Sequence, residues 1–226
     1  MTFDEQDKIL LKRFIEKLNS SNVNGLMALS DLWNITDKPS KLLIKKILDL
    51  DPHKYGFKGE EIDTEGEGIN LIKINNSSLI SQDEYSLDQN SYLPEHIMDR
   101  FNALNIQFQN DFQDRQLLIG SGYRSPAFQI ITLLFILVKF YKFDINETLK
   151  RVALPKYSEH CSIKNTALDI LNIDGLPNDE NPTEFAKTVE FNWLINNARN
   201  FGFKESYPKD NNLGIMWEPW HWRFID

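Results

Sequence analysis

Hydrophobic positions near the start of the chain follow the spacing of amphipathic helices. The first set recurs at intervals of three and four residues and consists of Leu11, Phe14, Ile15 and Leu18. Thr2 and Glu5 are spaced as a capping box and are predicted to begin this helix. A second helical pattern runs through residues 40–50. Two amphipathic helices are therefore expected before residue 51.

The composition changes in the next part of the chain. Residues 59–68 are acidic and contain glycine, and residues 75–92 are polar with little periodicity. Such stretches are typical of loops and connectors. We therefore expect two parts: residues 1–90 form a helical N-terminal extension ending in a connector, and residues 91–226 form the main domain. The extension is expected to pack onto that domain.

Helical and strand patterns are mixed from residue 93 onward. Helices are expected over residues 93–104, 126–143 and 181–203. Pro126 lies in the first turn of the second helix, and Gly202 is expected to end the third. Strands are expected over residues 115–121, 166–171 and 214–225. Since strands and helices do not alternate regularly, the pattern predicts an α+β fold with a small antiparallel sheet.

Charge and apolar length exclude some classes of protein. The formal net charge of −8 argues against charge-driven binding of nucleic acid, because such binding needs a cationic face. The longest apolar run, residues 130–138, is well short of the roughly 20 residues that cross a bilayer. The N-terminus lacks the pattern of a signal peptide, and Cys161 is the single cysteine. We therefore expect a cytoplasmic protein with no nucleic-acid partner, no membrane insertion and no intrachain disulfide.

Two of the four histidines have neighbours that suggest chemistry, whereas His53 and His96 are expected at the surface or in caps. His160 precedes the predicted strand that contains Asp169, and Glu218 comes three residues before the fourth histidine, His221. A catalytic zinc needs three such ligands and an open fourth position, and a further carboxylate can act as general base.

The chain thus offers His160, Asp169 and His221 as metal ligands and Glu218 as base. Spacing alone does not distinguish this set from a chance arrangement. In a straight strand residues 218 and 221 point to opposite faces, so the chain must bend near Pro219 for both to reach one metal.

Three motifs carry a resemblance to a known family. They are "SGYRSPAFQ" (121–129), "SEHCSIKNTALDI" (158–170) and "EPWHWRF" (218–224), and the segment 193–208 is similar as well. In their order and in their residues they resemble the motifs of the zinc D-alanyl-D-alanine carboxypeptidases of the vancomycin-resistance type. The wider group includes lysostaphin-type peptidases and the hedgehog signalling domain. The likeness covers residues 93–226, and the first ninety residues have no recognised counterpart.

The resemblance implies a hedgehog/D,D-peptidase-like fold and one Zn²⁺ ion per chain, bound by His160, Asp169 and His221. Glu218 would deprotonate the metal-bound water and return the proton to the leaving amine. The implied reaction removes a terminal D-alanine from a peptidoglycan stem peptide. The implied partner is therefore a peptide derived from peptidoglycan.

The resemblance also implies roles around the substrate. Arg124 would hold the scissile carbonyl or the terminal carboxylate, since its planar fork suits either oxyanion. Gln129 and Ser158 would form hydrogen bonds with the substrate. Tyr123 and Trp220 would wall the pocket.

One departure from the family concerns the spacing of the first histidine and the aspartate. The family usually has six intervening residues that include a glycine, whereas "CSIKNTAL" has eight and no glycine. An even insertion preserves the alternation of a strand, so Asp169 is still expected to face the metal. The altered loop leaves the substrate preference near Ser158 open.

Other interpretations remain open. A peptidoglycan endopeptidase, such as a phage lysis enzyme released to the cell wall, has the same chemistry. A non-catalytic binding protein could keep the zinc fold, although retention of Glu218 and Arg124 favours an enzyme. Cys161 is expected to be a small buried residue, and Glu159 to be structural. The sequence does not decide between D,D and L,D cleavage or determine the oligomeric state.

Overall fold

The computed structural model describes residues 1–18, 21, 23–64, 68–75, 91–175 and 182–225. The predicted boundary at residue 90 and most of the predicted connector lie outside these residues. Within them, no helix is both long and apolar enough to span a bilayer.

Three helices form the N-terminal part: α1 (Glu5–Leu18), α2 (Leu29–Ile35) and α3 (Lys38–Leu48). The four apolar positions predicted for the first helix are buried in α1. The capping box lies two residues later than predicted. The Asp4 carboxylate accepts from the Asp7 backbone N–H at 2.8 Å, and the Asp7 carboxylate accepts from the Asp4 N–H at 3.3 Å. The prediction from Thr2 and Glu5 was wrong because Asp4 precedes the first helical residue and caps it.

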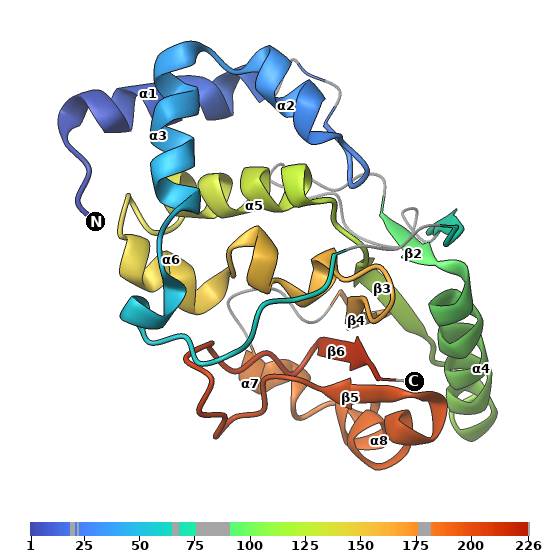
Figure 1. Cartoon of the computed structure of the whole chain (residues 1–226). Helices are drawn as coiled ribbons and strands as arrows, with labels where there is room; N and C mark the ends of the chain where they lie inside the picture. The colour runs from blue at the N-terminus through green and yellow to red at the C-terminus, as the bar shows by residue number, and fades with distance from the viewer. Residues whose placement is uncertain (19–20, 22, 65–67, 76–90, 176–181, 226) are drawn as a thin grey trace.

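Helix α5 (Pro126–Lys139) is buried on nearly every side, as its apolar sequence predicts. It begins with Pro126 after Ser125, whose hydroxyl accepts from the Phe128 N–H at 3.2 Å. The three N-terminal helices pack against α5 together with α6 (Ile145–Arg151). Figure 1 shows α1–α3 in blue on one side of α5 and the red and orange strands on the other. The N-terminal part therefore packs onto the rest of the chain, as expected, through one shared hydrophobic core.

The main sheet has four antiparallel strands in the order β3-β4-β6-β5. Their bounds are Leu117–Ser121 for β3, Ala167–Asn172 for β4, His221–Phe224 for β6 and Phe203–Glu205 for β5. Helices α4 (Glu95–Asp111) and α8 (Val189–Asn197) join the sheet in a second hydrophobic core. Strands β1 (Leu71–Lys73) and β2 (Tyr92–Pro94) form a separate antiparallel pair. The α+β fold with a small antiparallel sheet is confirmed.

The helix predicted over 126–143 ends at Lys139, and two other predicted elements differ more from expectation. The helix predicted over 181–203 is divided into α7 (Pro182–Phe185), α8 and a 3₁₀ helix that ends at Gly202, whose φ is 85°. Thr188 starts α8 by accepting a hydrogen bond from the Phe191 N–H at 3.3 Å. The strand predicted over 214–225 is confined to β6, because the chain turns immediately before it: the His221 N–H donates to the Glu218 carbonyl at 3.0 Å.

Candidate active site

The register of the main sheet places three polar residues side by side. Ser121 of β3 pairs with Asp169 of β4, and Asp169 pairs with His221 of β6. The neighbours Leu168 and Ile170 are fully buried in the core beneath the sheet. Because side chains alternate along a strand, Asp169 points to the opposite face. The eight-residue spacing therefore keeps Asp169 beside the histidines, as predicted, and its Oδ1 lies 3.2 Å from His221 Nδ1.

His160 reaches the same place from a 3₁₀ helix, Glu159–Cys161. Its Nδ1 lies 2.8 Å from the Gly122 carbonyl oxygen, which can only accept a hydrogen bond. This contact assigns the proton of a neutral imidazole to Nδ1 and leaves Nε2 as a lone-pair donor. His160 Nε2 lies 3.5 Å from Asp169 Oδ2. The two imidazole rings are 4.9 Å apart between centroids, at 80° to one another.

His160, Asp169 and His221 form a set that fits a metal ion. One ligand atom from each lies within 4.8 Å of the others. Both histidines are buried, and Asp169 is largely buried. Two imidazoles and one carboxylate are a ligand set typical of catalytic zinc, which keeps its fourth position open. The donor set and its clustering therefore fit Zn²⁺.

Glu159 supports this set from behind His221. Its Oε2 lies 2.9 Å from His221 Nε2, which is the ring nitrogen that does not face Asp169. Burial disfavours the charged imidazole, but hydrogen bonds to Asp169 and Glu159 outweigh it and raise the pKa of His221 to about 10. Burial also opposes ionisation of Glu159, yet His221 lowers the pKa of that carboxyl to about 2. The pKa of His160 is lowered, mainly because the imidazole is buried and also because Arg124 is positively charged. These directions apply to the metal-free protein.

Glu218 lies in the turn that precedes β6. Its backbone N–H donates to the Tyr207 carbonyl at 3.1 Å, and Glu218 itself is 6% exposed. Its Oε2 is 3.7 Å from His221 Nδ1, and its Oε1 accepts from Arg151 Nη1 at 2.7 Å. The predicted bend at Pro219 is present, so Glu218 and His221 face the same site.

Arg124 is anchored close to the three candidate metal ligands. Its Nε and Nη2 donate to Ser121 Oγ at 3.1 and 2.9 Å, and Nη1 donates to Gln129 Oε1 at 3.4 Å. Its Nη2 also lies 3.4 Å from Asp169 Oδ2. The Gln129 side chain is fixed in turn by a 2.9 Å hydrogen bond to the Ala153 carbonyl. The guanidinium is thus held beside the Asp169 carboxylate.

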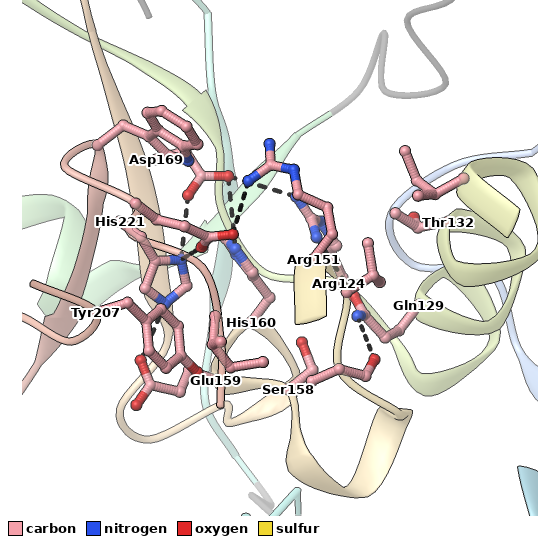
Figure 2. Close-up of a pocket in the computed structure, with 16 residues that line it drawn as sticks. Arg124, Gln129, Thr132, Arg151, Ser158, Glu159, His160, Asp169, Tyr207 and His221 are labelled. Carbon is pink, nitrogen blue, oxygen red and sulfur yellow. Dashed lines mark hydrogen bonds and ion pairs between the residues drawn. The ribbon is translucent and has the colours of Figure 1, made fainter. Parts of the chain in front are cut away.

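These residues line one cleft between α5, the end of α6 and the sheet (Figure 2). The lining residues are Arg124, Gln129, Thr132, Ile136, Arg151, Val152, Ala153, Ser158, Glu159, His160, Asp169, Tyr207, Ile215, Glu218, Trp220 and His221. Of the residues predicted for the site, eight lie in this lining. Tyr123 does not, because its backbone pairs with Tyr92 and its side chain is buried outside the cleft.

The sequence analysis assigned no role to Tyr207 or Arg151, although Tyr207 lies within the family-like segment 193–208. The Tyr207 ring lies 4.9 Å from the His221 ring at 35°, so it occupies a wall position of the kind expected of Tyr123. Arg151 pairs with Glu218 across 67 residues of sequence. The likeness of the segment 193–208 to the family was the available signal for Tyr207, and nothing local distinguishes Arg151 from other basic residues.

The N-terminal part reaches the back of the cleft wall. Phe57 is 6% exposed and forms a small hydrophobic cluster with Tyr207 and Ile215. The Lys58 N–H donates to the Leu213 carbonyl at 2.8 Å, and the Ile62 N–H donates to the Lys156 carbonyl at 2.7 Å. Residues 57–62 therefore support the wall that carries Tyr207.

The other histidines and the cysteine have structural or surface positions, as predicted. His53 and His96 are exposed, as expected, and His96 Nε2 lies 3.0 Å from the Lys164 carbonyl oxygen in the lengthened loop. Lys164 also pairs with Asp63 at 2.8 Å. Cys161 is fully buried, and burial raises the pKa of its thiol to about 12, which disfavours the thiolate needed for metal binding.

The family can be assigned from comparison with known proteins. The family model described as "VanY: D-alanyl-D-alanine carboxypeptidase" matches residues 90–226. The chain therefore belongs to the VanY family of D-alanyl-D-alanine carboxypeptidases, as the sequence motifs indicated.

Two relatives are D-alanyl-D-alanine carboxypeptidases from enterococci. One from Enterococcus faecium is 30% identical over 143 residues, which are 62% of this chain and 39% of the relative. One from Enterococcus faecalis (strain ATCC 700802 / V583) is 37% identical over 76 residues, 33% of this chain and 25% of the relative. The chain thus spans less than half the length of these relatives.

Two solved structures share the fold. A mutant of the vancomycin resistance D,D-pentapeptidase VanY, in complex with Zn(II), gives a TM-score of 0.54 at 21% identity and covers 74% of this chain and 84% of that chain. The LdcB LD-carboxypeptidase gives a TM-score of 0.57 at 23% identity and covers 75% of each chain. At these identities the likeness shows the fold alone.

Proposed function

We propose that this protein is a zinc-dependent carboxypeptidase that removes the terminal D-alanine from peptidoglycan stem peptides. The observation that carries the proposal is the cleft in which Glu218 and Arg124 flank the cluster of His160, Asp169 and His221. Membership of the VanY family supports a D-Ala-D-Ala bond as the target.

His160, Asp169 and His221 would hold one Zn²⁺ ion. When bound, the ion would polarise the scissile carbonyl and lower the pKa of the attacking water. The hydrogen bond from His160 Nδ1 to Gly122 and the contact of Glu159 with His221 orient the two imidazoles for this role.

Glu218 is proposed as the general base. It takes a proton from the attacking water and gives it to the leaving amine, a contribution typically worth about 10²–10⁴-fold in rate. Its carboxylate lies 3.7 Å from His221 Nδ1 and is fixed in orientation by Arg151 and the turn at Pro219. The base therefore sits next to the ligand set without being part of it.

Arg124 is proposed to stabilise the negative charge that develops on the carbonyl oxygen. Two contacts to Ser121 and one to Gln129 hold its planar fork in place, so little reorganisation is needed during the reaction. Gln129 and Ser158 would bind the peptide, and Trp220 would wall the pocket.

The test is release of free D-alanine from a soluble pentapeptide that ends in D-Ala-D-Ala. We expect release with added zinc, loss of release with a chelator, and loss of both zinc and activity in His160→Ala. His96→Ala removes an exposed histidine and should change neither. No release from protein that holds one zinc per chain would refute the proposal, and release of cross-linked fragments from purified cell wall would indicate an endopeptidase instead.

A further inference from the structure

Arg151 is a second arginine in the cleft, at the last position of α6. Its Nη1 donates to Glu218 Oε1 at 2.7 Å, and its guanidinium carbon lies 5.0 Å from the centroid of the Trp220 ring. The Arg151 side chain is 12% exposed. We propose that Arg151 binds the terminal carboxylate of the substrate and so restricts the enzyme to the end of a peptide. This inference rests on the proposed carboxypeptidase function.

The chemistry of the leaving group fixes where such a cation must lie. The amine that leaves and the terminal carboxylate are attached to the same Cα, so two bonds of about 1.5 Å separate the nitrogen from the carboxylate carbon. The base that protonates the amine must therefore have the carboxylate receptor as a close neighbour. Arg151 is in direct contact with Glu218, the proposed base.

Arg124 is placed for the other anionic group of the reaction. Its fork is directed to Ser121, Gln129 and Asp169, on the side of the metal-binding set. Among the described residues that line the cleft, Arg124 and Arg151 are the arginines, and none is a lysine. The geometry thus assigns the carbonyl oxygen to Arg124 and the terminal carboxylate to Arg151.

The surroundings of Arg151 suit a small terminal residue. Val152 follows Arg151 directly, and Ile136 and Ile215 line the same cleft, so the cleft offers apolar surface for a methyl group. The Met216 N–H donates to the Lys150 carbonyl at 2.9 Å, which ties the loop that carries Glu218 to the end of α6. A guanidinium presents five N–H donors in a planar fork, so it can contact two carboxylates at once. Arg151 can therefore keep Glu218 in place while it binds the substrate.

The experiment compares N-acetyl-L-lysyl-D-alanyl-D-alanine with its C-terminal amide on the zinc-loaded protein. The wild type should have a kcat/KM at least about tenfold higher for the acid, because a charge-assisted hydrogen bond is lost in the amide. Arg151→Gln should lower kcat/KM for the acid at least about tenfold more than for the amide, because the loss for the amide reports only the weaker hold on Glu218. Arg199→Gln replaces an exposed arginine and is the control, so it should leave kcat/KM for the acid and for the amide unchanged.

The ratio of kcat/KM for the acid to kcat/KM for the amide separates binding of the terminal carboxylate from positioning of Glu218. A loss that Arg151→Gln imposes equally on acid and amide would overturn the inference, because Arg151 would then act through the base alone. If the wild type hydrolyses neither peptide, the proposed function fails. In that case calorimetric binding of the two peptides decides: a preference for the acid that Arg151→Gln removes supports the receptor, and equal binding overturns it.

Discussion

Glu159 lies 2.9 Å from His221 Nε2, opposite the ring nitrogen that faces Asp169. Arg223 contacts the other oxygen of Glu159 at 3.4 Å and helps to hold it. The imidazole of His221 is thus fixed from both sides by carboxylates that come from separate segments. This arrangement orients a ligand and increases its basicity in metal sites.

Replacing Glu159 with Gln should weaken zinc binding. Loss of such an outer carboxylate typically lowers metal affinity by about 10- to 100-fold. Competition with a chromophoric chelator measures the effect, and Glu16→Gln, at an exposed position of α1, is the matched control. Equal zinc affinity of Glu159→Gln and wild type would show that Glu159 does not support the ligand.

Zinc binding should release about one proton per chain at pH 7. In the metal-free protein Asp169 and Glu159 raise the pKa of His221 to about 10, so this imidazole is protonated, whereas burial lowers the pKa of His160 and keeps it neutral. A metal must displace the His221 proton, so zinc affinity should increase by about tenfold for each unit that the pH is raised, up to a pH of about 10, and should decrease in acid. Calorimetry in buffers of different ionisation enthalpy counts the protons. Zinc binding without proton release would contradict the expectation.

Glu218→Gln should keep zinc and fold while turnover falls by about 10²–10⁴-fold, because the amide cannot accept the proton of the attacking water. The side-chain shape is retained, and the amide oxygen can still accept from Arg151. Zinc content, thermal unfolding and D-alanine release are measured on the same preparation. The assigned base would be refuted by a variant that retains normal turnover.

Arg115→Ala should destabilise the protein by about 3–5 kcal/mol. Arg115 Nε lies 2.5 Å from Glu190, whose side chain is fully buried in α8, and Arg115 also contacts Asp174. Removing the arginine leaves an unpaired buried carboxylate. Denaturant unfolding measures the loss, with the exposed Arg100→Ala as control within about 0.5 kcal/mol. A loss below about 1 kcal/mol for Arg115→Ala would show that the pair is not needed.

We propose that residues 91–226 form the catalytic part but depend on the N-terminal helices. Leu11, Phe14 and Ile44 of these helices share a core with α5. A chain that begins at residue 51 would expose this apolar face and should unfold without cooperativity or aggregate. Leu11→Ala is the milder test, with an expected loss of about 2–5 kcal/mol in the full chain. Unchanged cooperative unfolding of the shortened chain would contradict the dependence.

Much of the local structure could be predicted because it follows from short-range patterns. The apolar stripe of α1, the buried helix after Pro126, the strand that carries Asp169 and the stop at Gly202 all lie where periodicity and turn chemistry place them. Shorter elements were missed. Helix α2 has seven residues and β1 and β2 three each, too few for a clear period.

The candidate ligands were named from motifs, but only the register of β4 against β6 brings Asp169 to His221 across 52 residues of sequence. Arg151 contacts Glu218, and Phe57 contacts Tyr207, but no local sequence pattern predicts either contact. The sequence by itself determined which side chains can bind a metal and which segments form helices and strands, since both depend on residue type and near neighbours. The tertiary structure alone decided which distant charges meet in the cleft, because a pairing between remote residues depends on how the whole chain packs.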